Sequence, residues 1–146
     1  VAAIYEGTNG IQAMDLVGRK LADGGEAAFR LLDEIEKGAE AARGDRPELA
    51  APVWQAAENL REATEWMADQ PMQERFAGAV PYLRAFARVL GGHVHLSAAR
   101  AGRATHRALA AVHIHRLLPE HAGLLAEARA GAAGLYALSP EDLAAR

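Results

Sequence analysis

Cysteine is missing from this chain of 146 residues, and aromatic residues make up only 5% of it. The absence of cysteine excludes disulfides, thiolate zinc sites and cysteine nucleophiles, and it fits a reducing compartment such as the cytoplasm. No apolar run reaches the roughly 20 residues that a membrane-spanning helix needs, and no signal-peptide pattern opens the chain. We therefore expect a cytoplasmic protein without a membrane span.

The charged residues are nearly balanced, with 16 basic and 19 acidic side chains and a formal charge of −3. A dedicated nucleic-acid binder would need a basic surface, so this balance argues against a nucleic-acid partner. Hydrophobic residues make up 51% of the chain, and many of them are alanine, a strong helix former. The composition therefore predicts an all-α domain. The sequence opens with Val1-Ala2-Ala3-Ile4 and no methionine, so we expect a fragment of a longer protein.

Apolar side chains recur at steps of three and four residues, which predicts helices over about 10–23, 25–43, 48–70, 73–102 and 104–131. We expect Pro119 to kink or split the last of them, and Pro81 or Gly91-Gly92 to bend the fourth. Ser139 should cap a short terminal turn. The sum is an antiparallel four-helix bundle preceded by a loop and a short helix. The predicted inward faces of the last two long helices are Phe76, Val80, Leu83, Ala87, Leu90 and Val94, and then Leu109, Val112, Leu117, Leu124 and Leu125.

The segment around Glu6 carries the clearest chemical signal. Glu6 is followed by Gly7 and Gly10 in a turn just ahead of the first helix. Glycines let a backbone approach a ligand closely, and the free amides of a helix N-terminus favour an ionised carboxylate, which is the form a general base needs. The alternative is that Glu6 is simply an acid on a surface loop near a helix.

A resemblance bears on this choice. The residues Tyr5-Glu6-Gly7-Thr8, followed by Ile11-Gln12 and Gly18-Arg19-Lys20, closely resemble the YEGT-x-x-IQ motif of acyl-CoA dehydrogenases. A looser resemblance covers the rest of the chain, through 79–84, Gly91-Gly92 and 117–119. In these positions the chain resembles the extra C-terminal helical domain of one branch of the acyl-CoA dehydrogenases. That branch includes the 3-methylmercaptopropionyl-CoA dehydrogenases. Residues 1–23 would then end the catalytic domain, and residues 24–146 would form the C-terminal bundle.

The resemblance implies a flavin oxidoreductase of fatty acid metabolism that converts an acyl-CoA to the trans-2-enoyl-CoA. Glu6 would remove the α-proton, and the β-hydrogen would leave as hydride to FAD. Tyr5, Glu6 and Gly7 would line the substrate, with the Glu6 backbone N–H helping to hold the thioester carbonyl. Thr8 would lie near FAD, which is bound mainly outside this fragment. Expected partners are the acyl-CoA substrate, an electron-transfer flavoprotein and further subunits of a homo-oligomer.

One position departs from the family pattern. Gly10 stands where many family members carry a glutamine that contacts the adenosine half of FAD, and glycine cannot make that contact. The fragment alone should be inactive, because the FAD- and CoA-binding body would lie upstream. The alternative reading of the bundle is a helical interaction or oligomerisation module with no activity of its own.

Histidines and arginines give weaker signals. The pairs His93/His95 and His113/His115 are two residues apart on predicted helices, where they point to nearly opposite sides, so we expect no metal site. Arg100, Arg103 and Arg107 share one helical face. That face is either a solvated stripe or a contact for an anion or a partner, such as an acidic surface on a sister subunit.

Overall fold

The computed structural model describes residues 8–145, and these residues form helices and turns without a strand. The all-α fold class is therefore confirmed. The elements are α2 (Asn9–Asp15), η1 (Leu16–Lys20, a π-helix), α3 (Glu26–Ala42), α4 (Pro47–Asp69), α5 (Met72–Ala77), α6 (Ala79–Ala101), α7 (Ala104–Val112), η2 (His113–Leu117, a π-helix), α8 (Glu120–Ala128), η3 (Ala133–Tyr136, a 3-10 helix) and α9 (Pro140–Ala144).

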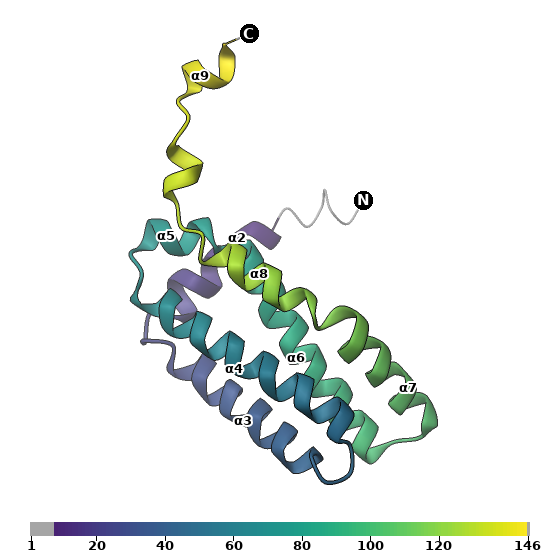
Figure 1. Cartoon of the computed structure of the whole chain (residues 1–146). Coiled ribbons are helices and arrows are strands. Elements are labelled where there is room, and N and C mark those ends of the chain that lie inside the picture. Colours follow the sequence, from purple (N-terminus) through teal and green to yellow (C-terminus); the bar gives the residue numbers. More distant parts are fainter. Residues whose placement is uncertain (1–7, 146) are drawn as a thin grey trace.

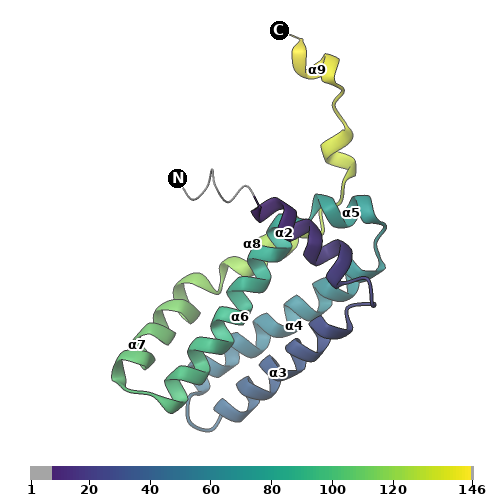
Figure 2. The same cartoon turned by 180° about the vertical axis from the view of Figure 1, so that it is seen from behind.

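Four long antiparallel elements form the bundle, as the sequence predicts. They are α3, α4, α6 and the combined α7–η2–α8 segment (Figure 1). The short α2–η1 segment and α5 lie at the end of the bundle from which the C-terminal segment projects (Figure 2). No helix in the described part of the chain is both long enough and apolar enough to cross a membrane.

The α3–α4 pair packs as the apolar spacing predicts. The apolar side chains at three- and four-residue steps along α4 are all buried, namely Val53, Ala57, Leu60, Ala63 and Met67, and Leu60 and Met67 are fully inaccessible to solvent. On α3, Leu32 and Ile35 are buried, while Phe29 is half-buried. Across this interface Arg61 of α4 donates hydrogen bonds to carboxylates of α3, and this bridges the two helices on the outside of the core.

The predicted inward face of α6 is wrong in most positions. Val80 and Val94 are 48% and 56% exposed, and the residues that are buried instead are Ala79, Pro81, Tyr82, Ala85, Val89, Gly92, Leu96 and Ala99. The prediction fails because α6 has several packing partners, which are α2, α3, α4, α7 and α8. Apolar residues are therefore needed on more than one side of this helix. A helix of that kind has no single stripe that reveals which side faces the core.

The fourth predicted helix is divided at Gly78 into α5 and α6, and α6 continues through Pro81 and Gly91-Gly92. A Cβ at position 78 would lie 2.2 Å from the backbone oxygen of Ala128, so this close approach to α8 requires glycine. Pro81 lies in the first turn of α6, where its missing amide hydrogen has no helical partner to lose. Gly91 and Gly92 continue the helix, and Gly91 leaves room for the ring of His113.

The last long helix is split ahead of Pro119, as predicted. The backbone N–H of Leu118 donates to the oxygen of His113, five residues back, at 2.8 Å. The inward side chains before the split differ from the predicted ones. The predicted inward residues Leu109, Val112 and Leu117 are 51%, 56% and 40% exposed, and Ala110, Ile114 and Leu118 are buried in their place. Leu124 and Leu125 are buried as predicted.

Candidate functional site

The structure describes one of the four predicted site residues. Tyr5, Glu6 and Gly7 lie outside the described residues, and Thr8 stands at the N-terminal boundary of α2. The Thr8 side chain is exposed and makes no capping hydrogen bond, whereas its backbone oxygen accepts from Gln12 N at 2.7 Å. Within residues 8–145 the Thr8 hydroxyl thus plays no part in capping its own helix.

The helix that follows the motif is anchored in the bundle core. Ala13, Val17 and Leu21 are buried to within 1% of complete inaccessibility and belong to the same core cluster as α3, α4 and α6. The opposite side of α2 carries Ile11 and Met14, which are 66% and 45% exposed. The helix after the motif thus has one apolar side fixed to the bundle and another that is largely exposed within residues 8–145.

Arg75 holds the end of this helix against the rest of the bundle. Its guanidinium donates to the backbone oxygens of Val17 (3.2 Å), Gln70 (2.8 Å) and Ala68 (2.5 Å). A planar guanidinium with several fixed donors suits such a junction of three carbonyls. The sequence reasoning missed this role because Arg75 lacks a periodic or motif signal, and backbone oxygens leave no trace in a sequence.

Gly18, Arg19 and Lys20 end the motif, and only the first has a packing role. A Cβ at Gly18 would lie 3.4 Å from the Phe76 ring, an ordinary contact distance, so η1 packs against α5 at this position. Arg19 donates to both carboxylate oxygens of Asp15, at 2.6 and 2.9 Å. These hydrogen bonds lower the pKa of the Asp15 carboxyl below its usual value. The pair is exposed and four residues apart, so it stabilises the helix locally and touches no site.

Two hollows flank this end of the bundle. One, of about 430 Å³, lies between α5 and η3 and is lined by Met72, Gln73, Phe76, Ala77, Leu135 and Tyr136. The other, of about 280 Å³, lies between η1, α3 and α6 and is lined by Leu16, Lys20, Leu21, Ala27, Ala28, Leu31 and Phe86. Neither hollow gathers the acid, base or nucleophile that chemistry requires.

Two of the histidines, His113 and His121, have structural partners. His113 Nε2 lies 3.1 Å from the oxygen of Arg88, and its ring stacks on His95 at 4.7 Å between centroids. His121 Nδ1 lies 2.6 Å from the oxygen of Leu118, and its Nε2 lies 3.0 Å from the amide nitrogen of Asn59. Burial, and then the neighbouring His113, lowers the pKa of His95. Within residues 8–145 no group of three potential ligands is placed to hold a metal ion.

Comparison with known proteins assigns the chain to a family. The sequence profile of the family described as "Acetyl-CoA dehydrogenase C-terminal like" matches residues 31–139, so the chain belongs to this family. The chain is 36% identical over 94 residues to a 3-methylmercaptopropionyl-CoA dehydrogenase of Ruegeria pomeroyi. That match covers 57% of this chain and 15% of the relative, so this chain spans a small part of that enzyme's length. No solved structure matches the chain.

Proposed function

We propose that this chain is the C-terminal part of an FAD-dependent acyl-CoA dehydrogenase and that Glu6 is its catalytic base. The complete protein would convert an acyl-CoA thioester to the trans-2-enoyl-CoA. The family membership over residues 31–139 supports the class of enzyme, and the Tyr5-Glu6-Gly7-Thr8 motif supports the residue. The observation that carries the proposal is that this motif directly precedes a helix held in the core by Ala13 and Val17.

The residues of this chain would act by position and charge. The Glu6 carboxylate would accept the proton on the carbon next to the thioester carbonyl, and its backbone N–H would donate to the carbonyl oxygen. That hydrogen bond stabilises the negative charge that develops as the proton leaves. A base misplaced by about 1 Å can lose roughly 100-fold in rate, so anchoring the following helix in the bundle has catalytic value.

The described residues fit FAD only at the edge of its site. The Thr8 hydroxyl is exposed and unused by its own helix, so it can bond to the cofactor. The hollows beside α5 and η1 are lined mainly by apolar side chains rather than by a glycine-rich phosphate cradle. Most of the FAD site would therefore be built by residues outside this chain. When bound, FAD would accept the β-hydrogen as hydride.

A kinetic comparison of two glutamate variants tests the role of Glu6. The complete gene product is assayed for enoyl-CoA formation with an artificial electron acceptor, as wild type, Glu6→Gln and Glu26→Gln. We expect Glu6→Gln to lower kcat by about two to four orders of magnitude, because a general base contributes about that much. The exposed Glu26 at the start of α3 is the matched control and should leave turnover unchanged. Undiminished turnover of Glu6→Gln would refute the assigned role.

A second function, an interaction module, is favoured by the apolar side chains on the surface. Four large apolar side chains are each more than half exposed, and they are Leu109, Val112, Leu138 and Leu143. Exposed apolar surface of this kind is typical of sites that bind another protein. The 146-residue chain on its own should bind no flavin and oxidise no acyl-CoA. Flavin absorbance in this purified chain would contradict the proposal that the chain alone is an interaction module.

A further inference from the structure

The N-terminal half of α2 is exposed within residues 8–145. Residues 9–12 are all exposed, and the first buried residue of the helix is Ala13. Glu6 stands three positions before the first residue of this helix in the sequence. Among the described residues, the direction in which α2 points is therefore set from its other end, where the helix continues into η1 (Figure 2).

That other end carries a backbone oxygen that has lost its regular partner. In an α-helix the N–H of Leu21 would donate to Val17 O, four residues back. At the end of η1 it donates instead to Leu16 O, five residues back, at 3.1 Å. Short π-helical turns of this kind are frequent at functional sites. Here the turn leaves Val17 O open to a donor from a side chain.

Arg75 of α5 supplies this donor. Its Nη1 donates to Val17 O at 3.2 Å, while its Nε donates to Gln70 O at 2.8 Å and its Nη2 to Ala68 O at 2.5 Å. Ala68 and Gln70 belong to the last turn and the C-terminal cap of α4, a helix whose apolar face lies in the core. A guanidinium is planar, and its donors are fixed relative to one another. The end of η1 is thereby held at a fixed place relative to the end of α4.

A small error at Val17 becomes a larger one at the motif. The helix from Val17 back to Asn9 is about 12 Å long, so a tilt of about 5° moves its N-terminus by about 1 Å. A catalytic group that is misplaced by about 1 Å can lose roughly 100-fold in rate. Loss of the contact at Val17 O would therefore affect the chemical step without touching the reacting atoms.

We propose that Arg75 is a positioning residue for Glu6, because its bond to Val17 O fixes the direction of α2 and so the place of the carboxylate. This inference rests on the proposed function and adds a residue that the motif does not contain. Arg75 acts through the helix and contacts neither the substrate nor the flavin. Its loss should therefore slow removal of the α-proton and leave the binding of acyl-CoA and FAD unchanged.

A double-mutant cycle in the complete, FAD-loaded protein tests this role. Arg75→Met keeps most of the aliphatic stem and removes the three donors, so it should lower kcat roughly 10- to 100-fold at unchanged KM and flavin content. In the Glu6→Gln background the same change should cost less than about twofold, because the effects of two groups that act as a unit are not additive. Equal losses in the two backgrounds would show that Arg75 acts independently of Glu6 and would overturn the proposal.

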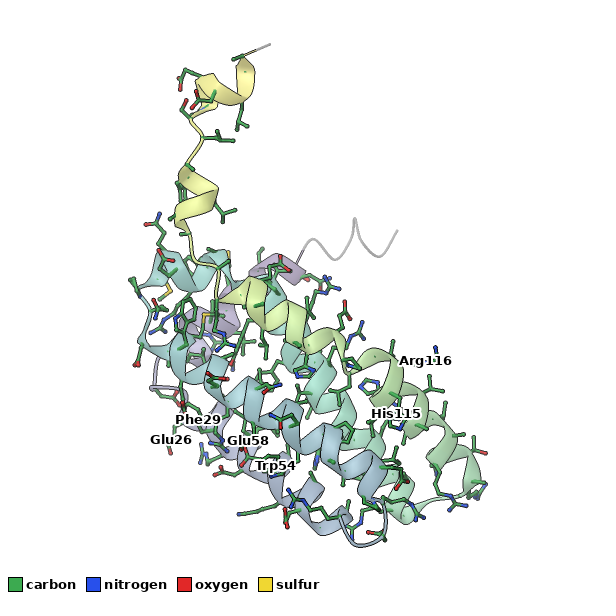
Figure 3. All side chains as sticks on the ribbon, in the orientation of Figure 1. Glu26, Phe29, Trp54, Glu58, His115 and Arg116 are labelled. Atoms are coloured by element: carbon green, nitrogen blue, oxygen red, sulfur yellow. The ribbon has the colours of Figure 1, made fainter. Side chains whose placement is uncertain are left out.

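Arg61→Met is the matched control for a general loss of stability. Arg61 of α4 also joins two helices, since it donates to Glu36 of α3 at 2.8 Å and lies over the ring of Phe29 at 5.8 Å. Figure 3 shows Phe29 on the side of the bundle that α3 and α4 form. We expect this variant to lower the midpoint of thermal unfolding and to leave kcat unchanged. A loss of kcat as large as that of Arg75→Met would overturn the proposal.

Arg75→Lys covers the case in which Arg75→Met does not fold. An ammonium keeps the charge but has no planar fork to span three carbonyls, so we expect a loss in kcat of roughly tenfold that again depends on Glu6. Full activity of both Arg75 variants beside a slow Glu6→Gln would overturn the positioning role and leave the proposed function standing. Full activity of Glu6→Gln would overturn the proposed function, and this inference with it.

Discussion

α4 buries nine of its 23 residues, whereas α7 buries one of its nine. Both helices are rich in apolar residues, but those of α4 point to the core and those of α7 point outward. Leu60 is fully buried, while Leu109 is 51% exposed. The difference teaches that apolar residues on a helix do not by themselves mark its core-facing side, because on α7 the large ones, Leu109 and Val112, are more than half exposed.

The largest expected difference comes from the same truncation made in each helix. Leu60→Ala removes buried methyl groups and leaves a cavity, so we expect it to lower the free energy of unfolding by about 2–5 kcal/mol. Leu109→Ala removes mostly solvated groups and should stay within about 0.5 kcal/mol of the wild type. Urea unfolding followed by circular dichroism measures both. Equal losses would mean that α7 is buried in the folded chain and would break the comparison.

A glycine pair extends the comparison to the junction of α5 with α6. Gly78→Ala places a Cβ against the backbone of Ala128, which cannot yield as a flexible side chain would. We expect a loss of about 1–3 kcal/mol, the usual cost of overpacking. Gly123→Ala in α8 meets nothing within 4 Å and should stabilise the chain by roughly 0.5–1 kcal/mol. Thermal unfolding of the two variants should therefore shift in opposite directions, and a shared direction would count against the described contact.

The smallest expected effect concerns the buried hydroxyl pair between α4 and α6. Tyr82 OH lies 2.8 Å from Thr64 Oγ, and Thr64 donates to the oxygen of Leu60 at 2.7 Å. Tyr82→Phe removes one hydrogen bond of this chain, at a cost of about 1 kcal/mol. The one described residue that α7 buries is Ala110, which has no polar side chain. No substitution in α7 can therefore remove a buried side-chain hydrogen bond of this kind.

The same tyrosine gives the fold a pH dependence. Burial raises the pKa of Tyr82 to about 12, above the usual value of 10. The folded chain therefore binds this proton more tightly than the unfolded chain does. The Tyr82 contribution to stability is complete below pH 10 and is lost as the pH rises through about 12. Unfolding free energies measured from pH 8 to 11 should fall more for the wild type than for Tyr82→Phe; parallel curves would contradict this.

The sequence predicts the helices better than it predicts their faces. The α4 face is readable because α4 has one buried side and a matching stripe, from Val53 to Met67. The α6 face is not readable, because α6 has apolar residues on more than one side and packs on several partners. The split ahead of Pro119 follows from the missing amide of proline, but the π-turn at His113–Leu117 was not predicted.

In the candidate site, the sequence predicts the motif residues but not the contacts that anchor the helix after them. A short motif predicts Tyr5, Glu6, Gly7 and Thr8, and of these the structure describes Thr8. The anchoring of the following helix by Arg75 carries no sequence signal, because it uses backbone oxygens that come together only in the fold. The role of Glu6 therefore stays a prediction, supported by motif and family.

The central claim is that Glu6 removes the α-proton, and a single-turnover measurement tests it most directly. The complete, FAD-loaded protein is mixed with an acyl-CoA in a stopped-flow instrument, and the loss of flavin absorbance near 450 nm is followed for wild type and Glu6→Gln. The account predicts rapid bleaching in the wild type and bleaching about 100-fold slower or more in the variant, at equal flavin content. Equal bleaching rates, or a complete protein that binds no flavin, would contradict it.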